Sequence, residues 1–282
     1  MRKLLTALFL VFSTLVTTVY AEDAPPPGQI GVSPSMLELS IGSKPVNESL
    51  RLFNLKKTPT KVNVEVYNWT LDENNEVKLI PPTEQSLDQW MLINPKSFVL
   101  EPEKSQVVRL SIRPPVKPAP GEHRALIYFT EERMNDTTAV GEETPVEVLF
   151  KLGVGVYANA NPIKRSSSLK GLSLGKNGNS LKASITNSGN VHTRLKGTYS
   201  IWKKAKFPGI QNAEKYVTDA AAEKAPEGLV ASGQLNQTPV LPGRTRTITT
   251  QLPGLPGPGS YVVAVSGALD EKKIEKAYPI SR

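Results

Sequence analysis

The chain has 282 residues, with 34 Lys and Arg against 26 Asp and Glu, two His and no Cys. The absence of Cys excludes a thiol nucleophile, a disulfide and a thiolate metal site. Neither His123 nor His192 lies in a hydrolase or metalloprotease motif, and the sequence has no glycine loop of the kind that binds phosphate. The composition therefore predicts a protein that is not an enzyme and that carries no cofactor and no metal.

The first 21 residues are typical of a cleavable export signal. Arg2 and Lys3 give a charged start, residues 4–16 are mostly apolar, and residues 19–21 end in a small residue suited to cleavage. No later stretch approaches 18 apolar residues, so we expect no stable membrane insertion. The sequence predicts an exported chain.

Most of the remaining chain has the period of a β-strand, with apolar side chains at every second position. This pattern occupies residues 62–67, 108–113, 125–130, 146–156, 191–201 and 261–265. The 24 Pro and 20 Gly are frequent at the breaks between these runs. One Ala-rich segment, Asn212 to Lys224, fits either a short helix or a loop. The sequence predicts an all-β protein.

Landmarks recur in the same order in the two halves of the chain. Asn54 precedes Trp69 by 15 residues, and Asn187 precedes Trp202 by the same number. Pro-Gly turns at 118–122 and 256–260 each precede an alternating run. This order predicts two tandem immunoglobulin-like β-sandwich domains, at 22–158 and 159–282, in which the Trp side chains belong to the cores.

The longest alternating run follows a polar connection at residues 131–144. Its apolar row begins with Val146, Val148, Phe150, Leu152 and Val154, and such a strand spans roughly 40 Å at about 3.3 Å per residue. One interpretation is an ordinary last strand, which alternation alone favours. The other is an edge strand that completes an incomplete sheet in a partner protein, which is β-augmentation.

Residues 93–102, Ile-Asn-Pro-Lys-Ser-Phe-Val-Leu-Glu-Pro, are followed by Gln-Val-Val-Arg-Leu at 106–110. These segments resemble the proline, aromatic, leucine and glutamate-proline run of the periplasmic pilus-assembly chaperones, the PapD-like superfamily, and the arginine-bearing strand after it. The resemblance covers roughly residues 28–158 and marks the chain as a divergent member.

The resemblance implies a periplasmic chaperone that binds exported pilus, fimbrial or other β-rich subunits by donor-strand complementation. The five apolar side chains from Val146 to Val154 match the donor positions. The implied partner is a pilin-like subunit; the involvement of an outer-membrane usher and self-pairing through the edge strand stay open.

The chain departs from the family at the residues that anchor the subunit's carboxylate. The family has an Arg on its first strand, where this chain reads Pro34-Ser35-Met36, and a Lys late on the long strand, near Val154 or Gly155. Lys151 is the candidate substitute, paired with Arg124 or Lys164. The other interpretation of Lys151 is a solvated charge on the strand face.

A second function stays open: a structural or adhesive envelope protein with paired immunoglobulin-like domains and no chaperone activity. The basic excess favours anionic envelope surfaces or solubility over nucleic acid, which an exported protein rarely meets. His192 is expected to be exposed on the polar face of its strand, and His123 to lie in a turn.

Overall fold

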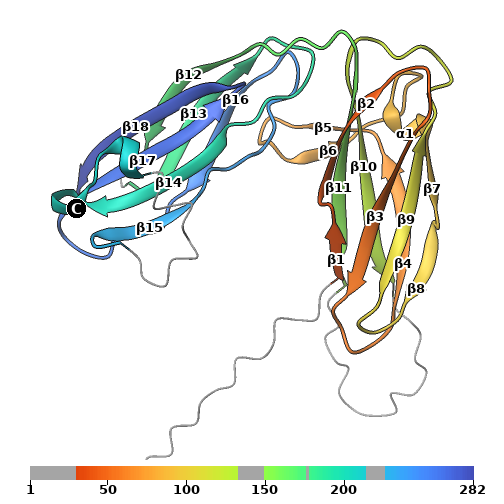
Figure 1. Ribbon diagram of the computed structural model, residues 1–282, viewed down its shortest axis with the longest axis horizontal. Coiled ribbons are helices and arrows are strands. Elements are labelled where there is room, and N and C mark those ends of the chain that lie inside the picture. Colours follow the sequence, from red (N-terminus) through yellow and green to blue (C-terminus); the bar gives the residue numbers. More distant parts are fainter. Residues whose placement is uncertain (1–29, 133–148, 176–177, 214–225) are drawn as a thin grey trace, which may run out of the picture.

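The computed structural model describes residues 30–132, 149–175, 178–213 and 226–282. It consists of two β-sandwiches that follow each other along the chain and meet at one end (Figure 1). The all-β prediction with two tandem sandwiches is confirmed. The predicted export signal and the donor candidates Val146 and Val148 lie outside the described residues and stay predictions.

The first sandwich has two sheets. One has the order β1-β3-β9-β7, formed by β1 (Ile30–Ser33), β3 (Val46–Asn54), β9 (Ser105–Ile112) and β7 (Met91–Asn94). The other has the order β2-β11-β10-β4-β8, formed by β2 (Met36–Ile41), β11 (Lys151–Ala160), β10 (Gly121–Glu132), β4 (Thr60–Tyr67) and β8 (Ser97–Leu100). The pairing of β2 with β11 is parallel, and the other pairings of this sheet are antiparallel.

The alternating residues of the sequence fill the core between these two sheets. Val62 on β4, Val108 on β9 and Ile127 on β10 are fully buried in one apolar cluster. The short helix α1 (Leu87–Trp90) closes the core with its Trp, and the hairpin β5 (Trp69–Leu71) and β6 (Val77–Leu79) extends from the sandwich. Because successive side chains of a strand point to opposite faces, the period of the sequence dictates which residues enter the core.

The second sandwich pairs a sheet of order β12-β13-β16 with one of order β15-β14-β17-β18. The strands are β12 (Ser167–Leu174), β13 (Ser180–Asn187), β16 (Thr245–Gln251), β15 (Leu229–Gln234), β14 (Lys196–Lys203), β17 (Ser260–Leu269) and β18 (Lys272–Ser281). A 3₁₀ turn, η1 (Lys204–Lys206), and the helix α2 (Ile210–Ala213) follow β14. The described part of the Ala-rich segment thus begins in a helix. Within the described residues, no helix is long and apolar enough to cross a bilayer.

The spacing that defined the sequence repeat has a structural counterpart in two buried asparagines. Asn54 donates from Nδ2 to the carbonyls of Thr58 and Leu100, and Asn187 donates to those of Val191 and Val240. In each case Oδ1 accepts the backbone N–H two residues further along. Each sandwich therefore uses one Asn to hold a turn where two strands end. The three Trp side chains are buried, but of the three only Trp90 lies in a main core. Trp69 packs in a separate cluster with Tyr157 and Leu241, and Trp202 in another with Ala213 and Ala264.

Candidate functional site

The strand β11 has two neighbours along one half and a single neighbour along the other. Residues 155–160 pair with β10 on one side and with Met36–Ile41 of β2 on the other. Residues 151–154 pair with β10 alone. Within the described residues, the first half of β11 is therefore an open sheet edge, which offers unpaired backbone groups to another strand.

The register with β10 indicates which backbone groups face this open edge. The N–H of Glu131 donates to the carbonyl of Phe150 at 3.0 Å, so residue 150 directs its backbone groups toward β10. Backbone direction alternates along a strand. Lys151 and Gly153 therefore direct their N–H and C=O groups toward the open edge.

The apolar row of the predicted donor strand divides into two parts. Phe150 and Leu152 are half-buried, and Leu152 packs against the rim of the first core. Val154 is fully buried inside that core, so its side chain belongs to the protein's own fold and is not presented to a partner. Of the described donor candidates, Phe150 and Leu152 alone keep part of their surface free.

The two candidate anchors, Lys151 and Arg124, do not lie together. Lys151 is opposite Thr130 in the β10 ladder, and Arg124 is opposite Tyr157. This separation of six residues amounts to about 20 Å at about 3.3 Å per residue. Lys151 is exposed, with Nζ 4.1 Å from the ring centre of Tyr128. The structure does not bring these two cations into one anchor.

Arg124 belongs instead to a contact between the two sandwiches. Its guanidinium lies 3.0 Å from Oε1 of Glu122, whose side chain is completely buried. Oε2 of Glu122 accepts the backbone N–H of His192 at 2.9 Å and also contacts Nδ1 of its ring. One buried carboxylate of the first sandwich thus binds a connecting segment of the second.

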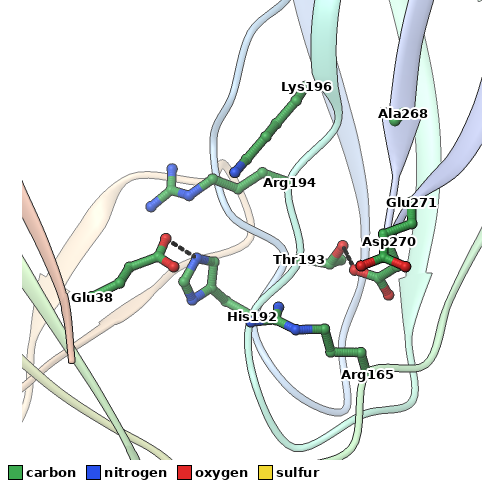
Figure 2. Close-up of a pocket in the computed structure, with 9 residues that line it drawn as sticks. All are labelled: Glu38, Arg165, His192, Thr193, Arg194, Lys196, Ala268, Asp270 and Glu271. Carbon is green, nitrogen blue, oxygen red and sulfur yellow. Dashed lines mark hydrogen bonds and ion pairs between the residues drawn. The ribbon is translucent and has the colours of Figure 1, made fainter. Parts of the chain in front are cut away.

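His192 is 6% exposed, so the prediction that it is exposed was wrong. Its ring packs 4.2 Å from the ring of Tyr157, and Nε2 lies 3.5 Å from Glu38. Figure 2 shows this histidine beside Glu38, with Arg194 on the same side. The other histidine, His123, is on β10 and not in a turn: it is buried, and its ring nitrogens lie 2.7 and 2.9 Å from two backbone carbonyl oxygens.

Burial and hydrogen bonding act in opposite directions on the acid of this contact. Burial raises the pKa of Glu122, but the hydrogen bonds and charge of His192, with the charge of Arg124, outweigh it and leave the pKa below its usual value. Burial raises the pKa of the Tyr157 hydroxyl, although Arg194 donates to it at 2.8 Å. Glu122 is therefore ionised in the folded protein near neutral pH.

A cavity of about 410 Å³ adjoins this contact. Its walls carry both signs of charge, with Arg165, Arg194 and Lys196 against Glu38 and Asp270 (Figure 2). Thr193 donates to Asp270 at 2.8 Å. Within the described parts of the chain, no cluster of His, Asp and Glu has the arrangement of a metal site.

The sequence interpretation missed the contact between the sandwiches because Glu122 and His192 are 70 positions apart. A local signal existed at Gly121, which precedes Glu122. Its φ is +117°, and a Cβ there would lie 2.7 Å from the carbonyl oxygen of Asn190. Only Gly permits this close approach of the second sandwich.

No known protein-family model matches the chain, and no curated protein does. Among solved structures, it is similar to the class 5 fimbriae chaperone CfaA, with 14% identity over 90% of this chain and 99% of that one, at a TM-score of 0.45. It is also similar to the E. coli chaperone DraB, with 13% identity over 91% of this chain and 100% of that one, at a TM-score of 0.41.

A third similar structure is the complex of the Salmonella enterica SafA pilin with the SafB chaperone. The identity is 12% over 92% of this chain and 99% of the matched chain, at a TM-score of 0.42. All three structures contain chaperones, the kind of protein that the sequence motifs at residues 93–110 resemble.

Proposed function

We propose that this protein is a periplasmic chaperone, without enzymatic activity, that binds exported pilin-like or other β-rich subunits by donor-strand complementation. The observation that supports this function is the open edge at residues 151–154 of β11. The apolar residues Phe150 and Leu152 flank backbone groups that face away from β10. A subunit that lacks one strand would pair with this edge and gain the apolar side chains for its core.

The free energy of binding comes from completing the client's sheet and core, so no nucleotide is needed. Burying a Phe or Leu side chain contributes on the order of 1.5–3 kcal/mol before the costs of ordering. Val146 and Val148 extend the proposed donor row toward the chain start. Val154 is left out of it because it is buried in the chaperone's own core.

A first experiment separates the backbone contribution from the side chains. Lys151→Pro removes an N–H that faces the open edge, whereas Lys151→Ala keeps it. Proline is tolerated at a strand edge, so both variants are expected to fold. The readout is co-purification of a co-expressed, exported pilin-like subunit that lacks its last strand. We expect Lys151→Pro to abolish capture relative to Lys151→Ala; equal capture would contradict strand pairing.

The variant Lys151→Ala also tests the proposed carboxylate anchor. If Lys151 binds the free carboxylate of the client, Lys151→Ala weakens binding of the intact subunit and leaves binding of a C-terminally amidated subunit unchanged. An equal effect on both forms would remove Lys151 as the anchor. Arg124→Lys is the matched test at the other candidate, where the charge is kept and the geometry of the guanidinium is lost.

Phe150→Ala tests the side chain without touching the backbone. Loss of one buried Phe is expected to weaken client binding by about 2 kcal/mol, roughly 30-fold. The control is Phe98→Ala, a half-buried Phe on β8, which pairs with β4 and is separated from β11 in the sheet by β4 and β10. Equal losses in the two variants would mean that stability, and not the donor row, limits capture.

A further inference from the structure

A buried carboxylate lies at the point where the donor strand begins. Glu131, near the end of β10, has a side chain that is 1% exposed. Its Oε1 lies 2.7 Å from Nζ of Lys56 and accepts the hydroxyl of Thr60 at 3.2 Å. Its Oε2 accepts the backbone N–H of Phe150 at 3.0 Å. Each oxygen therefore has a donor, as a buried charge requires.

This carboxylate takes a place that a backbone carbonyl normally occupies. In a hydrogen-bonded antiparallel pair, two opposite residues exchange both of their N–H···O=C bonds. Glu131 donates its N–H to the carbonyl of Phe150, but the N–H of Phe150 goes to the side chain of Glu131. The ladder between β10 and β11 thus ends on a side-chain hydrogen bond at Phe150.

Lys56, the cation of this ion pair, also contacts the side chain of Phe150. Nζ of Lys56 lies 5.7 Å from the ring centre of Phe150, within the range of a cation–π contact. Lys56 is itself fixed, because its N–H donates to Oδ1 of the buried Asn54 at 2.9 Å. The ion pair therefore restrains both the backbone and the ring of Phe150.

We infer that Glu131, held by Lys56, is a positioning residue that fixes Phe150 at the start of the donor strand in an extended conformation ready to pair with a client. This inference depends on the function proposed above. An edge strand that is already extended loses less conformational freedom on binding, so pre-organisation raises affinity. Glu131 touches no client; it acts through Phe150.

The first test needs no client. Amide hydrogen exchange at Phe150, followed by NMR on the full mature chain, is compared for the parent protein and Glu131→Ala. We expect exchange at Phe150 to accelerate about tenfold or more, as loss of a hydrogen bond to a charged group implies. Unchanged protection at Phe150 in the folded variant would overturn the inference.

The chain offers a matched control in the next residue. Glu132 also pairs with a lysine, Lys61 at 2.8 Å, but this pair is exposed, and the acceptor of the Phe150 N–H is Glu131. Glu132→Gln should leave exchange at Phe150 unchanged. An equal acceleration in Glu132→Gln would mean that charge near the end of β10, and not the buried carboxylate, controls this amide.

A charge swap separates positioning from stability and covers the case in which Glu131→Ala does not fold. The double variant Lys56→Glu with Glu131→Lys restores an ion pair, but a lysine at 131 has no acceptor for the N–H of Phe150. We expect its melting temperature to exceed that of Lys56→Glu alone while the Phe150 amide stays exchange-labile. Full restoration of protection would overturn the inference.

Client capture then distinguishes this inference from the function on which it depends. With the pilin-like subunit that lacks its last strand, Glu131→Ala is expected to bind about tenfold more weakly than Glu132→Ala, the loss expected for one charge-assisted hydrogen bond. If Lys151→Pro and Phe150→Ala leave capture intact, the proposed function fails. If those variants abolish capture and Glu131→Ala does not weaken it, the positioning role alone fails.

Discussion

The last strands of the two sandwiches, β11 and β18, stand in contrasting environments. Both pair with the strand before them through a long antiparallel ladder. β18 is the outer strand of its sheet along its whole length, whereas β11 is covered by β2 over its second half. The exposed edge is therefore long on β18 and short on β11.

The longer edge, on β18, carries side chains that discourage pairing, whereas the shorter edge, on β11, does not. On β18, Lys276 is exposed although it shares the inward parity of Ile274 and Tyr278, which pack on the second core, and Pro279 has no N–H to offer. A charge on the inward side and a proline are features that discourage edge-to-edge pairing. The open half of β11 has apolar Leu152 instead, with Phe150 directly before the strand. The edge of β18 is therefore protected against pairing with another strand, whereas the open half of β11 is available for it.

The largest expected effect concerns the buried asparagine that each sandwich uses to hold a turn. Asn54→Ala and Asn187→Ala each remove a buried amide that serves at least two backbone carbonyls. Leaving such carbonyls unpaired is expected to destabilise each sandwich by about 2–4 kcal/mol. Urea unfolding followed by hydrogen exchange in each sandwich measures the effect, and unequal losses beyond a factor of two would contradict equivalent roles.

The next effect concerns the contact that holds the two sandwiches together. Gly121→Ala places a methyl group 2.7 Å from the carbonyl oxygen of Asn190, at a φ of +117°. The backbone strain alone is expected to destabilise the folded protein by about 1–3 kcal/mol. We expect the sandwiches to separate, visible as a larger radius of gyration in solution scattering. Gly171→Ala, where a Cβ meets nothing within 4 Å, is the control; identical scattering of the two variants would count against this role of Gly121.

The same contact should respond to acid. Because the pKa of Glu122 is lowered in the folded protein, ionised Glu122 contributes stability above its ordinary pKa. That contribution is lost as the pH falls below 4.5 and through the lowered value. Denaturant unfolding from pH 6 to pH 3 measures it. Glu122→Gln should flatten the slope in this range, and a variant as steep as the parent would assign the acid response to other carboxylates.

The fold could be predicted from the sequence because the alternation of apolar and polar residues along each strand matches the side chains that the fold buries. The alternation of residues 125–130 placed Ala125, Ile127 and Phe129 in the core, where all three are buried. The 15-residue spacing from Asn54 to Trp69, repeated from Asn187 to Trp202, indicated two similar domains, and both Asn side chains are buried and hold a turn in their own sandwich. The alternation and the repeated spacing are patterns within short segments of the chain, so a single sequence reveals them.

The contacts at the site depend on distant residues and were not predicted. His192 was assigned to a polar strand face, but β14 begins only at Lys196, and residue 192 lies in a connection that packs on the first sandwich. The burial of Glu131, by contrast, could have been predicted from its position in the alternating pattern. It continues the inward row of residues 125, 127 and 129, and a carboxylate on that parity predicts a buried ion pair.

The smallest expected effect tests whether the protection of β18 is what keeps that edge unpaired. Lys276→Val with Pro279→Val removes the inward charge and restores an N–H on a strand whose neighbours are apolar. We expect weak self-association, with a dissociation constant in the range of about 1 mM, since one strand edge buries little surface. Sedimentation velocity at increasing concentration measures it.

The control for that last variant is Lys204→Val, which removes one positive charge from the 3₁₀ turn and alters no strand edge. Self-association of the double variant alone would show that Lys276 and Pro279 keep the longer edge monomeric. If the double variant stays monomeric, the length and twist of an edge must matter more than its side chains. In that case the open half of β11 would owe its availability to the point at which β2 begins, because Met36, the first residue of β2, is opposite Gly155. Extending that pairing from Gly155 toward Lys151 would close the edge.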